Sequence, residues 1–199
     1  MKNSVLLIID VQNDFCPGGL LAVNGGDEIV PLINKLAGEH AHVVLTQDWH
    51  PADHSSFASQ HKDATPFTQI EMPYGPQTLW PDHCIIGSHG AEFHPKLDVP
   101  NAELIIRKGF RRTVDSYSAF FENDHKTPTG LGGYLKERGF KHITFVGIAF
   151  DYCVRYSAED AMALGFDVDV IEAATRAIDL GGTAAATKKS FAERGINLR

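Results

Sequence analysis

The stretch V-G-I-A-F-D-Y-C-V, residues 146–154, decides the fold because it joins a strand pattern to a helix pattern. Just before it, residues 143–146 form an apolar, largely β-branched run that is typical of a buried strand. Gly147 ends this run, and from Val154 onward apolar residues recur at three- and four-residue steps, which predicts a helix. Cys153 therefore lies where a strand turns into the first turn of a helix.

This position gives the thiol of Cys153 a chemical interpretation. The free N–H groups and the positive end of the helix dipole favour a thiolate, which is the nucleophilic form. The same N–H groups can hold an oxyanion formed on a substrate carbonyl. The alternative is that Cys153 is a small buried core residue, and this stretch alone leaves both interpretations open. Asp151 is the predicted N-cap of the helix.

The composition is that of one ordinary globular domain, which we expect to span residues 1–199. The formal net charge of −7 argues against nucleic acid or an anionic membrane surface as a partner. The apolar runs are too short to span a bilayer, and the first residues do not resemble a signal peptide. Three cysteines at scattered positions form no disulfide framework, so we expect a cytoplasmic protein.

Strand and helix patterns alternate along the chain, which predicts an α/β fold. We expect a doubly wound, mostly parallel sheet of five to six strands with helices on both faces. A buried run at residues 5–9, a helix from Asp27 and a strand at 42–46 form a βαβ unit. The later elements are strands at 103–106 and 166–171, helices at 130–138 and 183–194, and a short edge strand at 196–198.

From about residue 48 to 101 regular structure is hard to find, and a loop of this length is usually functional. Asp48 and His50 are two residues apart, so in an extended segment both side chains can reach one cation. His54 and His83 follow in the same loop. An aspartate with two histidines leaves coordination positions open and suits zinc, iron or manganese. The alternative is that these are loop histidines on a solvated surface.

Asp10, Lys108 and Cys153 each follow the carboxyl end of a different predicted strand. In an open α/β sheet such ends meet at one crevice. Asp10 can accept a thiol proton and later give it to a departing amine, and Lys108 can favour the thiolate through its charge. Taken singly, Asp10 is better explained as a strand-end residue that binds backbone N–H groups, and Lys108 as a solvated lysine.

Five motifs occur in a fixed order: residues 10–15 with 17–19, 48–51, 80–84, 108–109, and 146–149 with 151–154. In this combination the chain resembles the isochorismatase-like cysteine amidohydrolases, and within them the nicotinamidases, essentially from end to end. The resemblance implies that nicotinamide is hydrolysed to nicotinate and ammonia through a cysteine thioester, in NAD salvage. It also implies that pyrazinamide is a further substrate. Self-association is left open.

The same resemblance implies roles for individual residues. Cys153 would be the nucleophile, Asp10 the general base and acid, and Lys108 the third member of the triad. The N–H groups of Ala149 and Cys153 would form an oxyanion hole after a cis Ile148–Ala149 peptide. Asp48, His50 and His83 would bind one divalent ion, with zinc favoured over iron or manganese, and His54 is a further candidate ligand. Phe15, Trp80 and Tyr117 would surround the pyridine ring.

Three other interpretations remain open from the sequence. A related cysteine amidohydrolase could act on a carbamoyl or ureido substrate, although those relatives generally lack the Asp48, His50 and His83 set. A metal-activated water could perform the hydrolysis, with Cys153 incidental. A catalytically inactive member could bind a partner instead, which the intact triad argues against.

Overall fold

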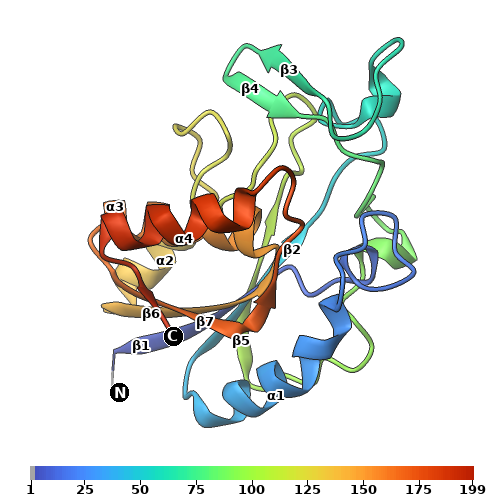
Figure 1. Ribbon diagram of the computed structural model, residues 1–199. Helices are drawn as coiled ribbons and strands as arrows, with labels where there is room; N and C mark the ends of the chain where they lie inside the picture. The colour runs from blue at the N-terminus through green and yellow to red at the C-terminus, as the bar shows by residue number, and fades with distance from the viewer. Residues whose placement is uncertain (1–2) are drawn as a thin grey trace.

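The computed structural model describes residues 3–199 and contains two sheets (Figure 1). The strands of the larger one are β1 (Ser4–Ile9), β2 (Val43–Asp48), β5 (Ala102–Lys108), β6 (His142–Ile148), β7 (Asp167–Arg176) and β8 (Asn197–Leu198). They lie in the order β5-β2-β1-β6-β7-β8, and each neighbouring pair is parallel. The predicted fold class is confirmed, including the short edge strand near the end of the sequence.

Helices cover both faces of this sheet (Figure 1). One face packs against α2 (Leu131–Glu137), α3 (Arg155–Ala163) and α4 (Thr183–Arg194), and the other packs against α1 (Val30–Glu39). The shorter helical turns are Asn13–Phe15, Gly26–Ile29, Ala58–Gln60, His89–Ala91 and a π-helical turn at Phe150–Val154.

Strand β1 shows why a continuous apolar run is needed at the centre of this sheet. All six of its residues are buried. Because successive side chains of a strand point to opposite faces, Val5 and Leu7 join the core under α2, α3 and α4. Leu6 and Ile8 join the core on the side of α1. Because both faces of β1 are buried under helices, the side chains on both faces must be apolar.

The functional crevice lies where the strand order reverses. The chain places β2 and β5 on one side of β1 and then β6 on the other, and ligands bind at such a switch point. Gly147 of β6 lies opposite Ile9 of β1. A Cβ on Gly147 would lie 2.1 Å from the carbonyl oxygen of Ile9, and its φ is +113°. Only glycine fits there, next to the segment that carries Cys153.

The long loop predicted at residues 48–101 contains a small hairpin that the sequence patterns did not reveal. Strands β3 (Gln69–Met72) and β4 (Gly75–Thr78) pair in antiparallel fashion as a sheet of their own. Each strand has four residues and most of them are partly exposed, so the alternation is too short to stand out. The hairpin projects away from the main sheet (Figure 1).

The prediction that Asp151 caps a helix is wrong. Ala149 occupies the N-cap position of the π-helical turn. The carboxylate of Asp151 instead accepts hydrogen bonds from the backbone N–H groups of Ile178 at 3.0 Å and Asp179 at 2.8 Å. It thereby ties the turn that carries Cys153 to the loop after β7. Within residues 3–199, no helix is long and apolar enough to cross a membrane.

Candidate active site

Lys108 lies at the centre of a buried polar cluster. Its Nζ atom is 2.8 Å from Oδ2 of Asp10 and 3.4 Å from Sγ of Cys153. It also contacts the carboxylate of Asp48 and donates to the carbonyl of Ser116 at 3.0 Å. Lys108 ends β5, Asp10 follows β1, and Cys153 lies in the turn after β6. The structure therefore brings together the three residues that the sequence suggested as a triad.

Burial is the largest influence on the pKa of each of these groups. It raises the pKa of the Asp10 carboxyl, although the charge of Lys108 acts in the opposite direction. It raises the pKa of the Cys153 thiol well above its ordinary value, again against Lys108. Burial disfavours the ammonium of Lys108 too, but Asp10 and Asp48 outweigh it and the pKa of Lys108 is raised. Desolvation of the sulfur therefore opposes the thiolate that the helix N-terminus and Lys108 favour.

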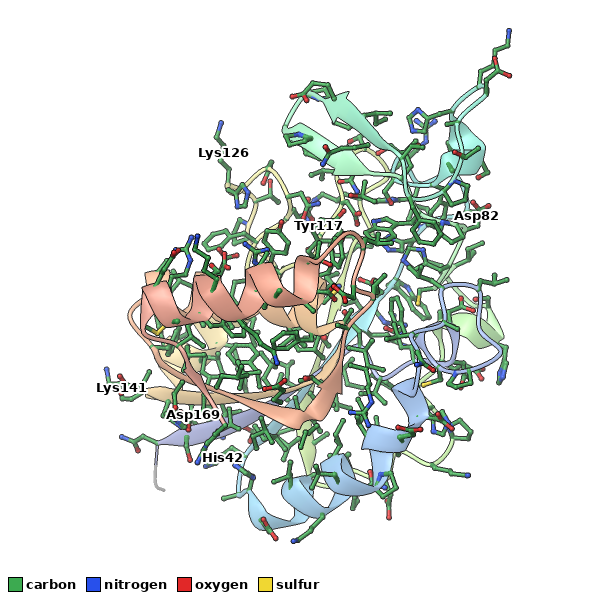
Figure 2. The ribbon with its side chains drawn as sticks, in the orientation of Figure 1. His42, Asp82, Tyr117, Lys126, Lys141 and Asp169 are labelled. Carbon is green, nitrogen blue, oxygen red and sulfur yellow. The ribbon has the colours of Figure 1, made fainter. Side chains whose placement is uncertain are left out.

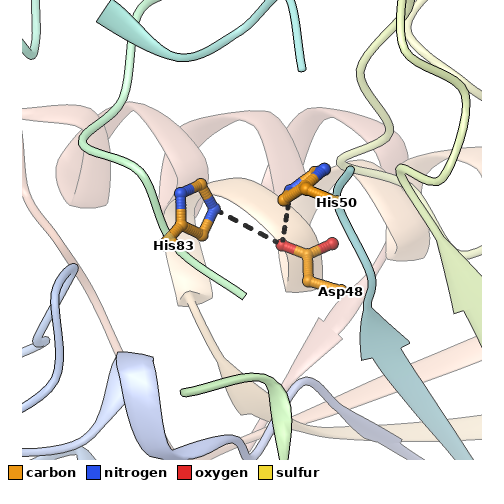
Figure 3. A group of neighbouring side chains, drawn as sticks. All are labelled: Asp48, His50 and His83. Atoms are coloured by element: carbon orange, nitrogen blue, oxygen red, sulfur yellow. Dashed lines mark ion pairs between the residues drawn. The ribbon is translucent and has the colours of Figure 1, made fainter. Parts of the chain in front are cut away.

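Asp48, His50 and His83 form a second group beside this cluster (Figure 3). Their ligand atoms all lie within 4.8 Å of one another. Oδ2 of Asp48 is 3.6 Å from Nε2 of His50 and 3.8 Å from Nε2 of His83. The Nδ1 atoms of the two histidines are each 2.8 Å from a backbone oxygen, that of Gly109 and that of Pro81. This leaves both Nε2 atoms for a metal, as in metal-binding histidines, so the donor set fits one divalent cation.

Asp48 belongs to both groups. Burial favours its neutral form, but the charges of Lys108 and His50 outweigh this and hold its pKa well below the ordinary value. One carboxylate oxygen contacts Lys108, and the other faces the two histidines. The cation group and the cysteine cluster therefore share one ionised side chain.

His54 lies next to this group, against the ring of His50. Its ring centroid is 4.4 Å from that of His50. Its Nδ1 is 2.7 Å from the hydroxyl of Ser56, and its Nε2 is 3.2 Å from the carbonyl oxygen of Val114. Both nitrogens thus have protein partners, and His54 is not among the three residues that converge around Asp48. His54 belongs instead to a neighbouring set with His50 and Asp115, whose ligand atoms also lie within 4.8 Å of one another, so its role as a further ligand stays a prediction.

A narrow pocket of about 20 Å³ lies between the two groups. The three residues suggested for the pyridine ring, Phe15, Trp80 and Tyr117, all line it. The other lining residues are Leu21, Asp48, His50, His83, Asp115, Ala149, Tyr152, Cys153 and Ile178. The pocket is therefore aromatic on several sides and carries the nucleophile and the cation group on its walls.

Asp115 is a pocket residue that sequence reasoning missed. It is buried, and one of its carboxylate oxygens lies within 4.8 Å of a ring nitrogen of each of His50 and His54. It accepts hydrogen bonds from Gln77 at 2.9 Å and from the backbone N–H of Ser116 at 2.8 Å. Its surroundings in the sequence have neither strand nor helix periodicity. A carboxylate within an aromatic-rich stretch was the one signal that could have found it.

The turn after β6 wraps around the carbonyl group of Ala149. That oxygen accepts hydrogen bonds from the N–H groups of Tyr152 at 3.1 Å and Val154 at 3.0 Å. The Ile148–Ala149 peptide is cis, as the family resemblance implied. Ala149 and Cys153 both line the pocket, which is the placement that an oxyanion hole made from their N–H groups requires.

We predict that Gly109→Ala weakens metal binding about 10- to 100-fold, the usual effect of disturbing a ligand's outer partner. A Cβ on Gly109 would lie 2.3 Å from Cε1 of His50, and the φ of Gly109 is +68°. The ring of His50 must therefore shift. Zinc competition against a chelating dye measures the effect. In Gly133→Ala, where the new Cβ meets no atom within 4 Å, affinity should be unchanged; equal affinity in both variants would refute the prediction.

The comparisons with known proteins agree with this geometry. Residues 4–196 match the model of the isochorismatase domain. The chain belongs to the isochorismatase family. It is 55% identical to a nicotinamidase of Acinetobacter baylyi over 182 residues, which is 92% of this chain and 85% of that protein. The family resemblance drawn from the five sequence motifs is therefore confirmed.

Solved structures of isochorismatase-family proteins are also similar to this chain. A nicotinamidase and pyrazinamidase of Acinetobacter baumannii is 54% identical, with a TM-score of 0.99 over 100% of this chain and 96% of that one. A pyrazinamidase of Pyrococcus horikoshii in complex with zinc is 32% identical, with a TM-score of 0.79 over 99% and 98% of the two chains.

Proposed function

We propose that this protein is a nicotinamidase, an amidohydrolase that converts nicotinamide to nicotinate and ammonia and also deamidates pyrazinamide. The observation that carries the proposal is the meeting of Cys153, Asp10 and Lys108 with the Asp48, His50 and His83 group in one pocket. The names of the similar proteins support it. We further propose a role in NAD salvage, a single domain over residues 1–199 and a cytoplasmic location.

The first half of the reaction forms a thioester. The sulfur of Cys153 attacks the carboxamide carbon while its proton passes to the carboxylate of Asp10. The carbonyl oxygen becomes an oxyanion, which the N–H groups of Ala149 and Cys153 stabilise. Asp10 then gives its proton to the amide nitrogen, the carbon–nitrogen bond breaks, and ammonia leaves. A raised pKa suits Asp10 to this exchange, because the acid form must donate readily near neutral pH.

The second half releases nicotinate. Asp10, again a carboxylate, takes a proton from the water that attacks the thioester carbon. The carbon–sulfur bond breaks, and the proton returns to the sulfur of Cys153. Throughout the cycle, the ammonium of Lys108 remains in contact with Asp10 and Asp48 and limits the repulsion between negative groups in the buried site.

The pocket also explains how a flat heteroaromatic amide is oriented. Phe15, Trp80 and Tyr117 offer aromatic surfaces to the ring. Asp48, His50 and His83 would hold the divalent cation, with zinc as our first proposal. When bound, this ion supplies a contact for the ring nitrogen. The side chains then place the carboxamide against Cys153.

The pH dependence of catalysis should follow Asp10. Because its carboxyl must be ionised to accept the thiol proton, kcat/KM should fall as the pH drops through its raised pKa. Thr46 donates to Oδ1 of Asp10 at 2.6 Å and so favours the ionised form. Thr46→Val should move the acid limb of the kcat/KM profile to higher pH, and Thr46→Ser, which keeps a hydroxyl, should not. A limb that stays in place in Thr46→Val would exclude Asp10 as the base.

Ammonia release tests the proposed function. Purified protein is loaded with zinc and supplied with nicotinamide, pyrazinamide or a carbamoyl compound, beside a sample stripped by a chelator. We expect release from the first two, and its loss in the stripped sample. Release from the carbamoyl compound alone would replace the proposal with a related cysteine amidohydrolase. Release that survives metal removal would leave the amidase and overturn the role of the cation.

A further inference from the structure

The pocket beside Cys153 is too small to admit a substrate in this conformation. Cys153 is 7% exposed. The free volume of about 20 Å³ is room for about one water molecule. A pyridine carboxamide is much larger than that. One wall of the pocket must therefore move before such a molecule reaches the thiol.

Tyr117 is the wall residue that separates this pocket from a second cavity. It lines both spaces. The second cavity has a volume of about 150 Å³, and two of its residues, Tyr74 and Pro76, belong to the β3–β4 hairpin region. Asn123, His125 and Tyr156 complete its lining. Tyr117 lies beneath the hairpin (Figure 2), so displacement of its side chain would join the two spaces.

One side-chain amide of the hairpin, that of Gln77, contacts Tyr117 directly. Nε2 of Gln77 is 2.8 Å from the hydroxyl oxygen of Tyr117 and 2.9 Å from Oδ2 of Asp115. It is also 2.7 Å from the carbonyl oxygen of Thr78, so two hydrogens serve three acceptors. Trp80 donates to the same hydroxyl at 3.1 Å. Gln77 thus connects two side chains of the pocket wall to strand β4.

The orientation of the Gln77 amide is fixed on its other side as well. Its Oε1 accepts from Nδ2 of Asn123 at 3.0 Å and from the hydroxyl of Tyr74 at 3.2 Å. The backbone N–H of Tyr117 donates in turn to Oδ1 of Asn123 at 3.0 Å. Every polar atom of the Gln77 side chain therefore has a partner, as a buried amide requires.

Gln77 is exceptional within its hairpin. It is the one buried residue of β3 and β4, and its side chain is fully inaccessible. Burying an amide is costly unless its hydrogen bonds are made. The hairpin itself forms a sheet apart from the main one. Through Gln77 the hairpin is joined by hydrogen bonds to Tyr117 and Asp115 of the pocket wall.

We propose that Gln77 is a positioning residue that latches the hairpin over the catalytic pocket and holds Tyr117 in the closed wall. When its contacts with Tyr117 and Asp115 break, the side cavity opens into the pocket and a small, neutral aromatic amide can reach Cys153. The identity of that substrate rests on the proposed function. The closure of the wall does not, and it can be tested without turnover.

Alkylation of Cys153 by iodoacetamide measures this opening directly. The reagent is a small neutral amide; the sulfur bonds to its methylene carbon, iodide leaves and the thiol proton passes to buffer. We expect Gln77→Ala, zinc-loaded and under native conditions, to be alkylated at Cys153 about tenfold faster than wild type, since the two hydrogen bonds to the pocket-wall residues Tyr117 and Asp115 are lost. Mass spectrometry of the peptides reports each cysteine separately. Cys84, which is 0% exposed, serves as an internal probe of global unfolding.

Two further variants sharpen the test. Gln77→Met keeps the side-chain volume but cannot hydrogen-bond, so it should behave like Gln77→Ala. Gln69→Ala removes an exposed glutamine from the same hairpin and should leave the alkylation rate of Cys153 unchanged. The proposal is overturned if the alkylation rates of Cys153 and Cys84 rise together, or if the rate at Cys153 does not rise in Gln77→Ala. A protein without nicotinamidase activity would still give either alkylation result, so the two proposals fail separately.

Discussion

Cys153→Ala should reduce ammonia release from nicotinamide by about 10⁴-fold or more, the usual loss when a covalent nucleophile is removed. The thiol of Cys153 lines the pocket, and its sulfur lies 3.4 Å from the ammonium nitrogen of Lys108. Without it there is no atom to form the thioester. The measurement is kcat for nicotinamide with zinc-loaded wild type and variant, after folding has been checked by thermal unfolding.

Cys16→Ala is the matched control for this substitution. Cys16 is also a buried free cysteine, but it does not line the catalytic pocket. We expect the turnover of Cys16→Ala to equal that of wild type. The zinc content of Cys16→Ala and of Cys153→Ala should be unchanged. If Cys153→Ala kept turnover within about tenfold of wild type, the nucleophile would be a metal-activated water and the thioester mechanism would be refuted.

Lys108→Met should lower the free energy of unfolding by about 3–5 kcal/mol at neutral pH, because it leaves buried carboxylates without their cation. Lys108 is 1% exposed and contacts both Asp10 and Asp48. Without the ammonium, burial and mutual repulsion push both carboxyl pKa values up. The variant then gains stability relative to wild type as the pH falls and the carboxyls take up protons. Denaturant unfolding of metal-free protein at two pH values measures this.

Lys35→Met provides the comparison. Lys35 is an exposed lysine of α1 that lies 3.9 Å from Glu39. Removing such a surface pair should change the unfolding free energy by less than about 0.5 kcal/mol at either pH. If Lys108→Met lost no more than this, the carboxylates would not depend on the lysine for their charge. We also expect Lys108→Met to lose most of its turnover, since Asp10 would be protonated in the resting site.

The sequence predicted the frame of the site because that frame depends on short-range patterns. The run at residues 5–9 is apolar at every position, as a strand buried on both faces must be. Parallel strands end at one edge, so Asp10, Lys108 and Cys153 had to approach one another once the strands were assigned. The two-residue spacing of Asp48 and His50 allowed both side chains to reach one cation if the segment was extended.

Other features depend on contacts between segments that are far apart in the chain. Asp115 and Gln77 are 38 residues apart and meet only through the hairpin. The burial of Cys153, which raises the pKa of its thiol, arises from several elements packed around it. Asp151 was predicted to cap a helix from its local position. Its carboxylate instead accepts a hydrogen bond from Ile178, which lies 27 residues later in the chain. No local pattern contains this information.

The sequence by itself therefore determined the family, the succession of the main strands and helices along the chain, and the chemical identity of the reactive groups. These follow from hydrophobic periodicity and from the residue types that a given chemistry needs. Only the tertiary structure showed how burial and charge shift the pKa values of those groups, which partners His54 contacts, and that Tyr117 lies between two cavities. Desolvation, charge pairing and hydrogen-bond satisfaction act through space, and their outcome depends on which distant residues are packed together.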